Sequence, residues 1–241
     1  MMPSMGDWAL FLLRWFHFLA GITWIGMLYY FNFVQTPFFA TAEPPVRSGM
    51  IVGSLVGRAL WWFRWGAMLT FITGWLYILF IAFHRFGGLQ PFFSVPYGWS
   101  IFIGGMLGSL MWANVWFVIW PAQQVVIASA TQVAKGGQAI PEAAARGARA
   151  GATSRTNTLL SVPMLFFMGA ASHFAFYTPT ARGAKITMLV VLFAIMAIVE
   201  WNALSTTQWA GKKMLATVKG TLWGGFVLAA VFFVALKLIF A

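Results

Sequence analysis

The sequence predicts an all-α fold: a polytopic transmembrane helix bundle of about six spans, forming a single domain over residues 1–241. Three observations predict this class. Hydrophobic residues make up 61% of the chain and charged residues only 8%, whereas soluble domains are about 25% charged on average. The apolar residues form runs of about 20 residues, the length that crosses the hydrocarbon core of a bilayer. Aromatic residues lie near the ends of these runs, as in the interfacial belts of membrane proteins.

Six apolar runs have the length and composition of spans. They are residues 8–34, 65–83, 99–120, 158–177, 186–204 and 221–240. The expected interfacial aromatic residues are Trp8, Trp65, Trp99, Trp120, Tyr177 and Trp223. The first run is preceded by neither a basic segment nor a small-residue cleavage site, so we expect a retained span and not a signal peptide.

The distribution of Lys and Arg predicts the orientation. Most basic residues fall in the first, third and fifth loops: Arg47, Arg58, Lys135, Arg146, Arg149, Arg155, Lys212, Lys213 and Lys219, with Arg64 at their edge. The other side carries Arg85, Arg182, Lys185 and Lys237. Because basic loops stay in the cytoplasm, we expect both termini in the periplasm and the chain in the bacterial inner membrane.

The longest predicted loop, residues 121–157, lies on the cytoplasmic side and is rich in Ala and Gly. We interpret it as a mobile amphipathic connector, with a partner-docking arm as the alternative. A short surface helix is possible from Pro141 onward.

Composition and motifs exclude several function classes. The net charge of +11 comes from basic residues in loops between apolar runs, not from a continuous basic face, so nucleic acid is not an expected partner. The chain has no cysteine, which excludes disulfides, thiolate catalysis and cysteine-ligated metals. We find no GxGxxG, P-loop or inverted repeat, so nucleotide chemistry and transport are disfavoured.

All three histidines of the chain are expected in the outer half of the membrane. His17 lies early in an inward-running helix, whereas His84 and His173 lie late in outward-running helices. Neutral imidazole is a good ligand for haem iron or another metal. The best pair for the two axial positions of a haem b is His17 with His173. The alternative for each is a histidine hydrogen-bonded to a neighbouring helix without a cofactor.

Other polar residues at membrane depth are candidates for supporting roles. Arg14, one turn from His17, is a candidate partner for a haem propionate, or a snorkelling arginine. His84, followed by Arg85, is a candidate for a peripheral contact to the cofactor. Glu200 should lie toward the cytoplasmic half at the depth of Asn114, as a proton-relay or quinone contact or as a neutral, hydrogen-bonded acid.

Four stretches carry a family resemblance. They are Leu13–Gly26 (LRWFHFLAGITWIG), Leu60–Ala67 (LWWFRWGA), Asn114–Gln123 (NVWFVIWPAQ) and Asn157–His173 (NTLLSVPMLFFMGAASH). Together they resemble the membrane domain of the bacterial cytochrome c-linked urate oxidase (urate hydroxylase) family. The first stretch is also similar to the histidine-containing first helix of small haem-linked membrane proteins of the protoporphyrinogen oxidase type.

The resemblance implies that His17 and His173 are functional histidines, and that electrons pass to a c-type cytochrome on the outer side. Full-length members of the family carry a Cys-x-x-Cys-His cytochrome domain, and this cysteine-free chain is expected to hold no covalent haem c. The family's second-span element tends to have His and Glu where this chain has Trp61 and Gly66.

Three functions follow as hypotheses. The first is a haem b-binding electron-transfer subunit that exchanges electrons with a periplasmic cytochrome c or with quinone. The second is a urate hydroxylase membrane domain that uses a separate cytochrome c. The third is a non-catalytic accessory subunit of a larger respiratory or photosynthetic complex.

Overall fold

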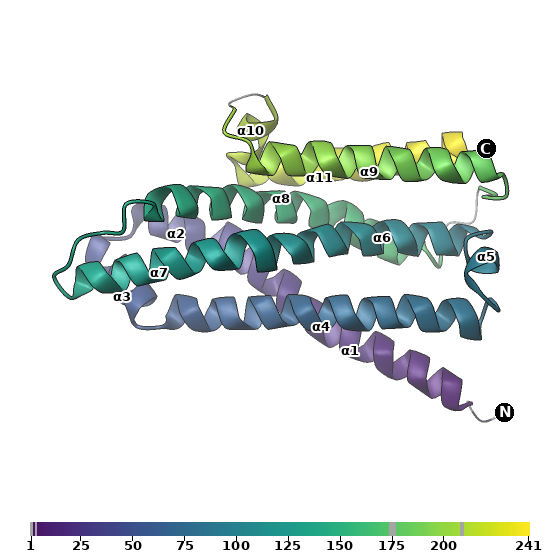
Figure 1. Ribbon diagram of the computed structural model, residues 1–241, viewed down its shortest axis with the longest axis horizontal. Coiled ribbons are helices and arrows are strands. Elements are labelled where there is room, and N and C mark those ends of the chain that lie inside the picture. The colour runs from purple at the N-terminus through teal and green to yellow at the C-terminus, as the bar shows by residue number, and fades with distance from the viewer. Residues whose placement is uncertain (1, 3, 174–176, 208–209) are drawn as a thin grey trace.

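The computed structural model describes residues 2, 4–173, 177–207 and 210–241. Within those ranges the chain is helical and contains no strand, which confirms the all-α class. Six long helices run along the length of an elongated bundle (Figure 1). They are α1 (Met5–Tyr29), α4 (Leu55–His84), α6 (Pro96–Ala113), α8 (Ala143–Ala170), α9 (Arg182–Leu204) and α11 (Val218–Ile239).

Two of the long helices continue through a π-helical turn. The first is α1, followed by η1 (Tyr30–Gln35) and α2 (Thr36–Thr41); the second is α6, followed by η2 (Asn114–Ile119) and α7 (Trp120–Ala134). Shorter helices complete the fold: α3 (Pro44–Val52), α5 (Leu89–Phe92) and α10 (Ala210–Leu215). Such π-turns are rare and occur often at functional sites.

Five helical segments of the described chain are long and apolar enough to span a membrane: residues 5–41, 55–84, 96–134, 182–204 and 218–239. The fourth predicted span, 158–177, corresponds to α8, which begins earlier at Ala143 and ends at Ala170; residues 174–176 of this span lie outside the described part of the chain. Its middle carries a buried polar run, including Thr153, Asn157 and Ser161. Because the surrounding helices shield α8, it does not need the uniformly apolar surface of a lipid-facing helix.

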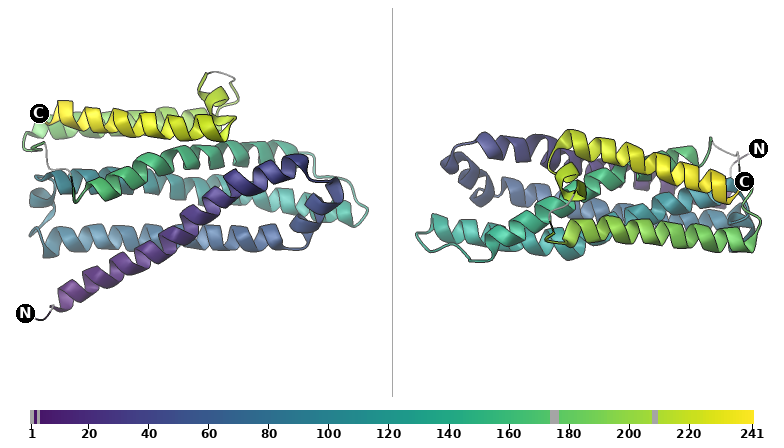
Figure 2. Two further views of the ribbon diagram at one scale, coloured as in Figure 1. Left: turned by 180° about the vertical axis from the view of Figure 1, so that it is seen from behind. Right: turned by 90° about the horizontal axis from the view of Figure 1, so that it is seen from above.

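The segment 121–157 differs from the predicted loop. Helix α7 reaches Ala134 and α8 starts at Ala143, so only residues 135–142 connect them. Alanine is the strongest helix former, and the Ala-rich composition that was interpreted as a loop instead extends both helices. Gly136 closes α7 in a left-handed conformation, with φ of +84°. The α7–α8 hairpin reaches beyond the ends of α9 and α11 (Figures 1 and 2).

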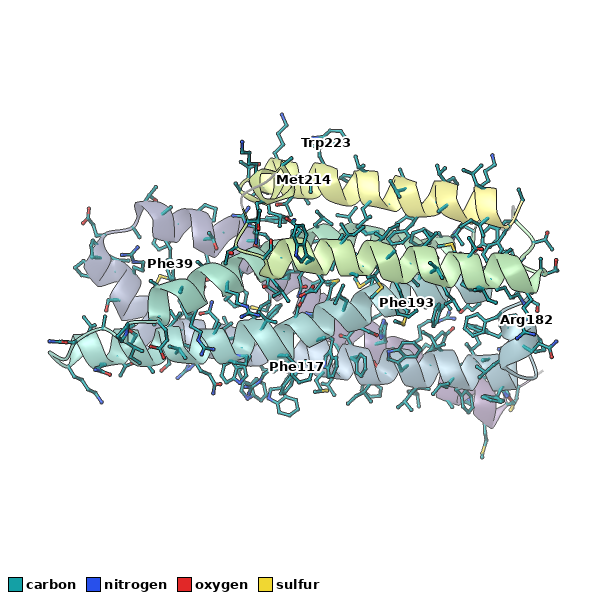
Figure 3. The ribbon with its side chains drawn as sticks, turned by 45° about the horizontal axis from the view of Figure 1, so that its top comes forward. Phe39, Phe117, Arg182, Phe193, Met214 and Trp223 are labelled. Carbon is teal, nitrogen blue, oxygen red and sulfur yellow. The ribbon has the colours of Figure 1, made fainter. Side chains whose placement is uncertain are left out.

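Large apolar side chains cover the outside of the bundle. Phe117 is 71% exposed and Trp223 is 62% exposed, and both project away from the helices (Figure 3). Further exposed residues of this kind lie on α1, α4, α9 and α11, including Phe18, Leu69, Val190 and Leu238. An apolar surface of this extent is compatible with a multi-pass membrane protein, whose lipid-facing side chains need no water.

Helix α1 crosses the bundle obliquely and packs closely against α4 (Figure 2, left). Gly66 of α4 permits this approach, because a Cβ there would lie only 3.1 Å from the backbone nitrogen of Trp24. The fully buried side chains of Trp24, Leu28 and Phe63 fill the core around this crossing. The crossing fixes which residues of α1 face α4 and which face α8.

Candidate functional site

His17 faces α4 and is held there by backbone. Its Nδ1 lies 2.9 Å from the carbonyl oxygen of Thr70 and 3.4 Å from the hydroxyl of Thr73. A carbonyl oxygen only accepts hydrogen bonds, so Nδ1 carries the proton and the lone pair is on Nε2. Gly74 makes room for the ring, since a Cβ there would lie 2.9 Å from its Cε1 atom.

His173 follows the last turn of α8 and is exposed. Its Nδ1 lies 3.0 Å from the carbonyl oxygen of Gly169, one turn earlier. The same reasoning assigns the proton to Nδ1 and the lone pair to Nε2. Metal-bound histidines usually have this arrangement, in which the second ring nitrogen donates to a carbonyl and fixes the tautomer.

Contacts between α1 and α8 relate the levels of these two histidines. Tyr29 bonds Ser161 at 2.9 Å, and Asn32 bonds Ser154 at 2.8 Å, so the helices run antiparallel. His17 precedes Tyr29 by twelve residues and His173 follows Ser161 by twelve. Both therefore lie on the same side of the Tyr29–Ser161 contact, toward one end of the bundle.

The structure does not bring the two rings into contact. His17 leans onto α4, and the N-terminal half of α1 follows α4 while it diverges from α8 (Figure 2, left). His173 has its hydrogen bond within α8. The two rings lie on different helices toward one end of the bundle, and the pairing of His17 with His173 at a haem stays a prediction.

Arg14 and His84 lie on the same α1–α4 interface as His17. Arg14 donates a hydrogen bond to the hydroxyl of Tyr77 and lies 5.0 Å from the centre of its ring. His84 stacks on Phe80 at 5.4 Å and lies 3.9 Å from the carboxylate of Asp7. Polar residues therefore line this interface from Asp7, at the start of α1, to His17.

A second polar site lies deeper, where η2, α8 and α9 meet. The Nδ2 of Asn114 donates to the side-chain oxygen of Asn157 at 2.9 Å and to Oε2 of Glu200 at 3.0 Å. Asn157 in turn donates to the carbonyl of Met111 at 2.9 Å. Asn114 and Glu200, expected at one depth from the sequence, are thus in direct contact. The π-helical turn η2 begins at Asn114.

Sequence reasoning missed several members of these sites. Asn157 was noted only as the start of a motif, and the pair of Asn32 with Ser154 was not noticed. Each lies in a predicted span or beside one, so a systematic search for amides in apolar runs would have found them. The pairing of Arg14 with Tyr77 has no comparable sequence signal, because it depends on how α1 crosses α4.

Fold and sites together define a polytopic α-helical membrane protein with histidines at one end and a buried amide–carboxyl network toward the other. Residues 88–234, more than half of the chain, match the model of the family described as urate oxidase N-terminal, and the chain belongs to that family. The match includes Asn114, Asn157, His173 and Glu200, and it begins after His17 and His84. No curated protein and no solved structure matches the chain.

Proposed function

We propose that the chain is a membrane redox domain that binds haem b through His17 and His173 and exchanges electrons with a c-type cytochrome or with quinone. The observation that carries this proposal is the shared state of the two imidazoles. Each has Nδ1 held by a backbone carbonyl, each has its lone pair on Nε2, and both lie toward one end of the bundle. Bound haem would supply one-electron chemistry, with axial ligands and burial setting its potential.

The residues around His17 fit such a cofactor. The Thr70 carbonyl fixes the ring orientation and raises the basicity of Nε2. Arg14 lies one helical turn from His17 and keeps further N–H donors in addition to the one bonded to Tyr77. We therefore assign Arg14 as the residue that would bind a haem propionate. His84, which contacts Asp7, is assigned a peripheral position beside the cofactor. The apolar side chains of the bundle would keep water from the iron.

The pyridine haemochrome assay on detergent-purified protein tests this proposal. We expect about one non-covalent haem b per chain. Stopped-flow mixing of the reduced protein with an oxidised soluble c-type cytochrome should then show matching oxidation of the one and reduction of the other. Haem-free protein that purifies in fixed stoichiometry with other membrane subunits would contradict the proposal and identify an accessory subunit.

Urate oxidation is the second candidate, and the family match favours it. In this view the membrane domain oxidises urate and a separate cytochrome c accepts the electrons. We assign the Glu200 carboxyl, held by Asn114, as a proton contact or a quinone contact. Membranes containing the protein, supplied with urate and oxidised cytochrome c, separate the two candidates. Cytochrome c reduction that requires urate supports urate oxidation by this chain, and cytochrome c reduction that is independent of urate rejects it.

A further inference from the structure

A cavity of about 930 Å³ lies where the three basic segments of the chain meet. Its walls come from η1, α2, α3 and the start of α4, from η2 and the α7–α8 hairpin, and from α10. Apart from η1 and η2, which fall in predicted spans, the residues that line it lie in the predicted first, third and fifth loops. In Figure 1 they gather toward one end of the bundle, with α10 at the ends of α9 and α11. We call this space the inner cavity.

The inner cavity is positively charged. Arg47 of α3, Arg155 of α8 and Lys212 of α10 line it, and none of the described residues in its lining is acidic. Three cations from three separate helices thus converge on one space. Because like charges that share a cavity repel one another, an anion there would stabilise the folded chain.

Two polar atoms of the lining lack partners. The Nη1 of Arg155 and the Oε1 of Gln35 are buried with no hydrogen-bond partner among the described residues. A buried polar atom that is left unpaired typically costs about 1–3 kcal/mol, and a charged one costs several kcal/mol at most. Lys212 donates to the carbonyl of Ala203 at 2.9 Å, and burial lowers the pKa of its amine. Arg155 and Lys212 can donate to a ligand oxygen, whereas the Oε1 of Gln35 can only accept a hydrogen bond.

Apolar side chains form another part of the lining. Phe31, Leu60, Phe63 and Ile119 face the same cavity as the cations. A small inorganic ion would use only the charged part, whereas an amphipathic ligand would use both. Tryptophans near the adjacent helix ends, Trp201 and Trp223, indicate the level of a membrane interface. Basic pockets between helices at that level are known to bind anionic headgroups.

We propose that the inner cavity binds an anionic phospholipid, with the headgroup phosphate on Arg155, Arg47 and Lys212 and the start of the acyl chains against Phe31 and Phe63. This site is distinct from the histidine end of the bundle, and it does not depend on haem. The lipid would bridge α3, α8 and α10 and hold the α7–α8 hairpin against the neighbouring segments.

Titration of delipidated protein with phosphatidylglycerol, followed by thermal unfolding and by native mass spectrometry, tests this proposal. We compare the wild type with Arg155→Gln and with Arg146→Gln, a control on the same helix that is exposed and does not line the cavity. Wild type and Arg146→Gln should be stabilised saturably by one retained lipid. Arg155→Gln should need about 10-fold more lipid, since one charge-assisted hydrogen bond is lost.

Three other results would overturn the proposal. If Arg155→Gln and Arg146→Gln respond alike, the proposal is overturned. If inorganic phosphate displaces the lipid or stabilises the protein equally, the site takes a free anion and the lipid assignment is wrong. Equal stabilisation by zwitterionic phosphatidylcholine rejects it as well. Should Arg155→Gln fail to elute as a monodisperse peak, Lys212→Gln replaces it, because Lys212 lies on the short helix α10 rather than in the central helix.

Discussion

Asn114 donates a hydrogen bond of 3.0 Å to Glu200, joining the π-helical turn η2 to helix α9. The same amide nitrogen also donates to Asn157 of α8, at 2.9 Å. One side chain thus connects three elements that are far apart in the sequence. The π-turn starts at this residue, and we infer that the local widening of the helix directs the amide toward both partners.

Truncation of Asn157 should destabilise the bundle. In Asn157→Ala the carbonyl of Met111 loses its side-chain donor and the Nδ2 of Asn114 loses one of its two buried acceptors, which should cost about 1–3 kcal/mol. Asn202→Ala is the matched control, because Asn202 is buried and its Oδ1 has no partner among the described residues. Thermal unfolding in detergent measures both, and equal shifts for the two variants would disprove this role.

The close packing of α11 on α8 requires Gly225. A Cβ at this position would lie 2.7 Å from the carbonyl oxygen of Leu159 and 2.8 Å from Cβ of Val162. Gly225→Ala should therefore lower the free energy of unfolding by about 1–3 kcal/mol through overpacking. Gly26→Ala should be neutral or slightly stabilising, since nothing lies within 4 Å of its Cβ position. A stable Gly225→Ala variant would show that α11 is not held this closely.

The orientation predicted from basic residues can be measured directly, because the chain has no native cysteine. Lys135→Cys, between α7 and α8, and Arg182→Cys, at the start of α9, both replace exposed residues. In whole cells a membrane-impermeant maleimide should label position 182, and position 135 should react only after permeabilisation. The opposite labelling pattern would place both termini in the cytoplasm.

Sequence reasoning predicted the all-α class because apolar composition and span length depend on lipid and not on tertiary contacts. It was less accurate for α8, since a central helix may carry Thr153, Asn157 and Ser161 when neighbouring helices cover them. It interpreted 121–157 as a loop because basic and small residues are also typical of extramembrane helices, which composition alone does not separate from loops.

For the candidate site, the sequence predicts the positions of residues along the helices better than it predicts which side chains contact one another. Counting residues along helices predicts that Asn114 and Glu200 lie at one depth, and the structure brings these two residues into contact. Which neighbour each side chain meets depends on the rotation and crossing of the helices. The contact of His17 with Thr70 arises only because Gly66 allows α1 to cross α4 closely.

The absorption spectrum of the purified protein, oxidised and reduced, tests the central claim most directly when it is recorded for His17→Ala, His173→Ala and the control His84→Ala. The account predicts a haem b spectrum with a Soret band in the wild type and in His84→Ala, and its loss or conversion to a five-coordinate form in each of the other two. A wild type without a Soret band, or a spectrum unchanged by either His17→Ala or His173→Ala, would contradict it.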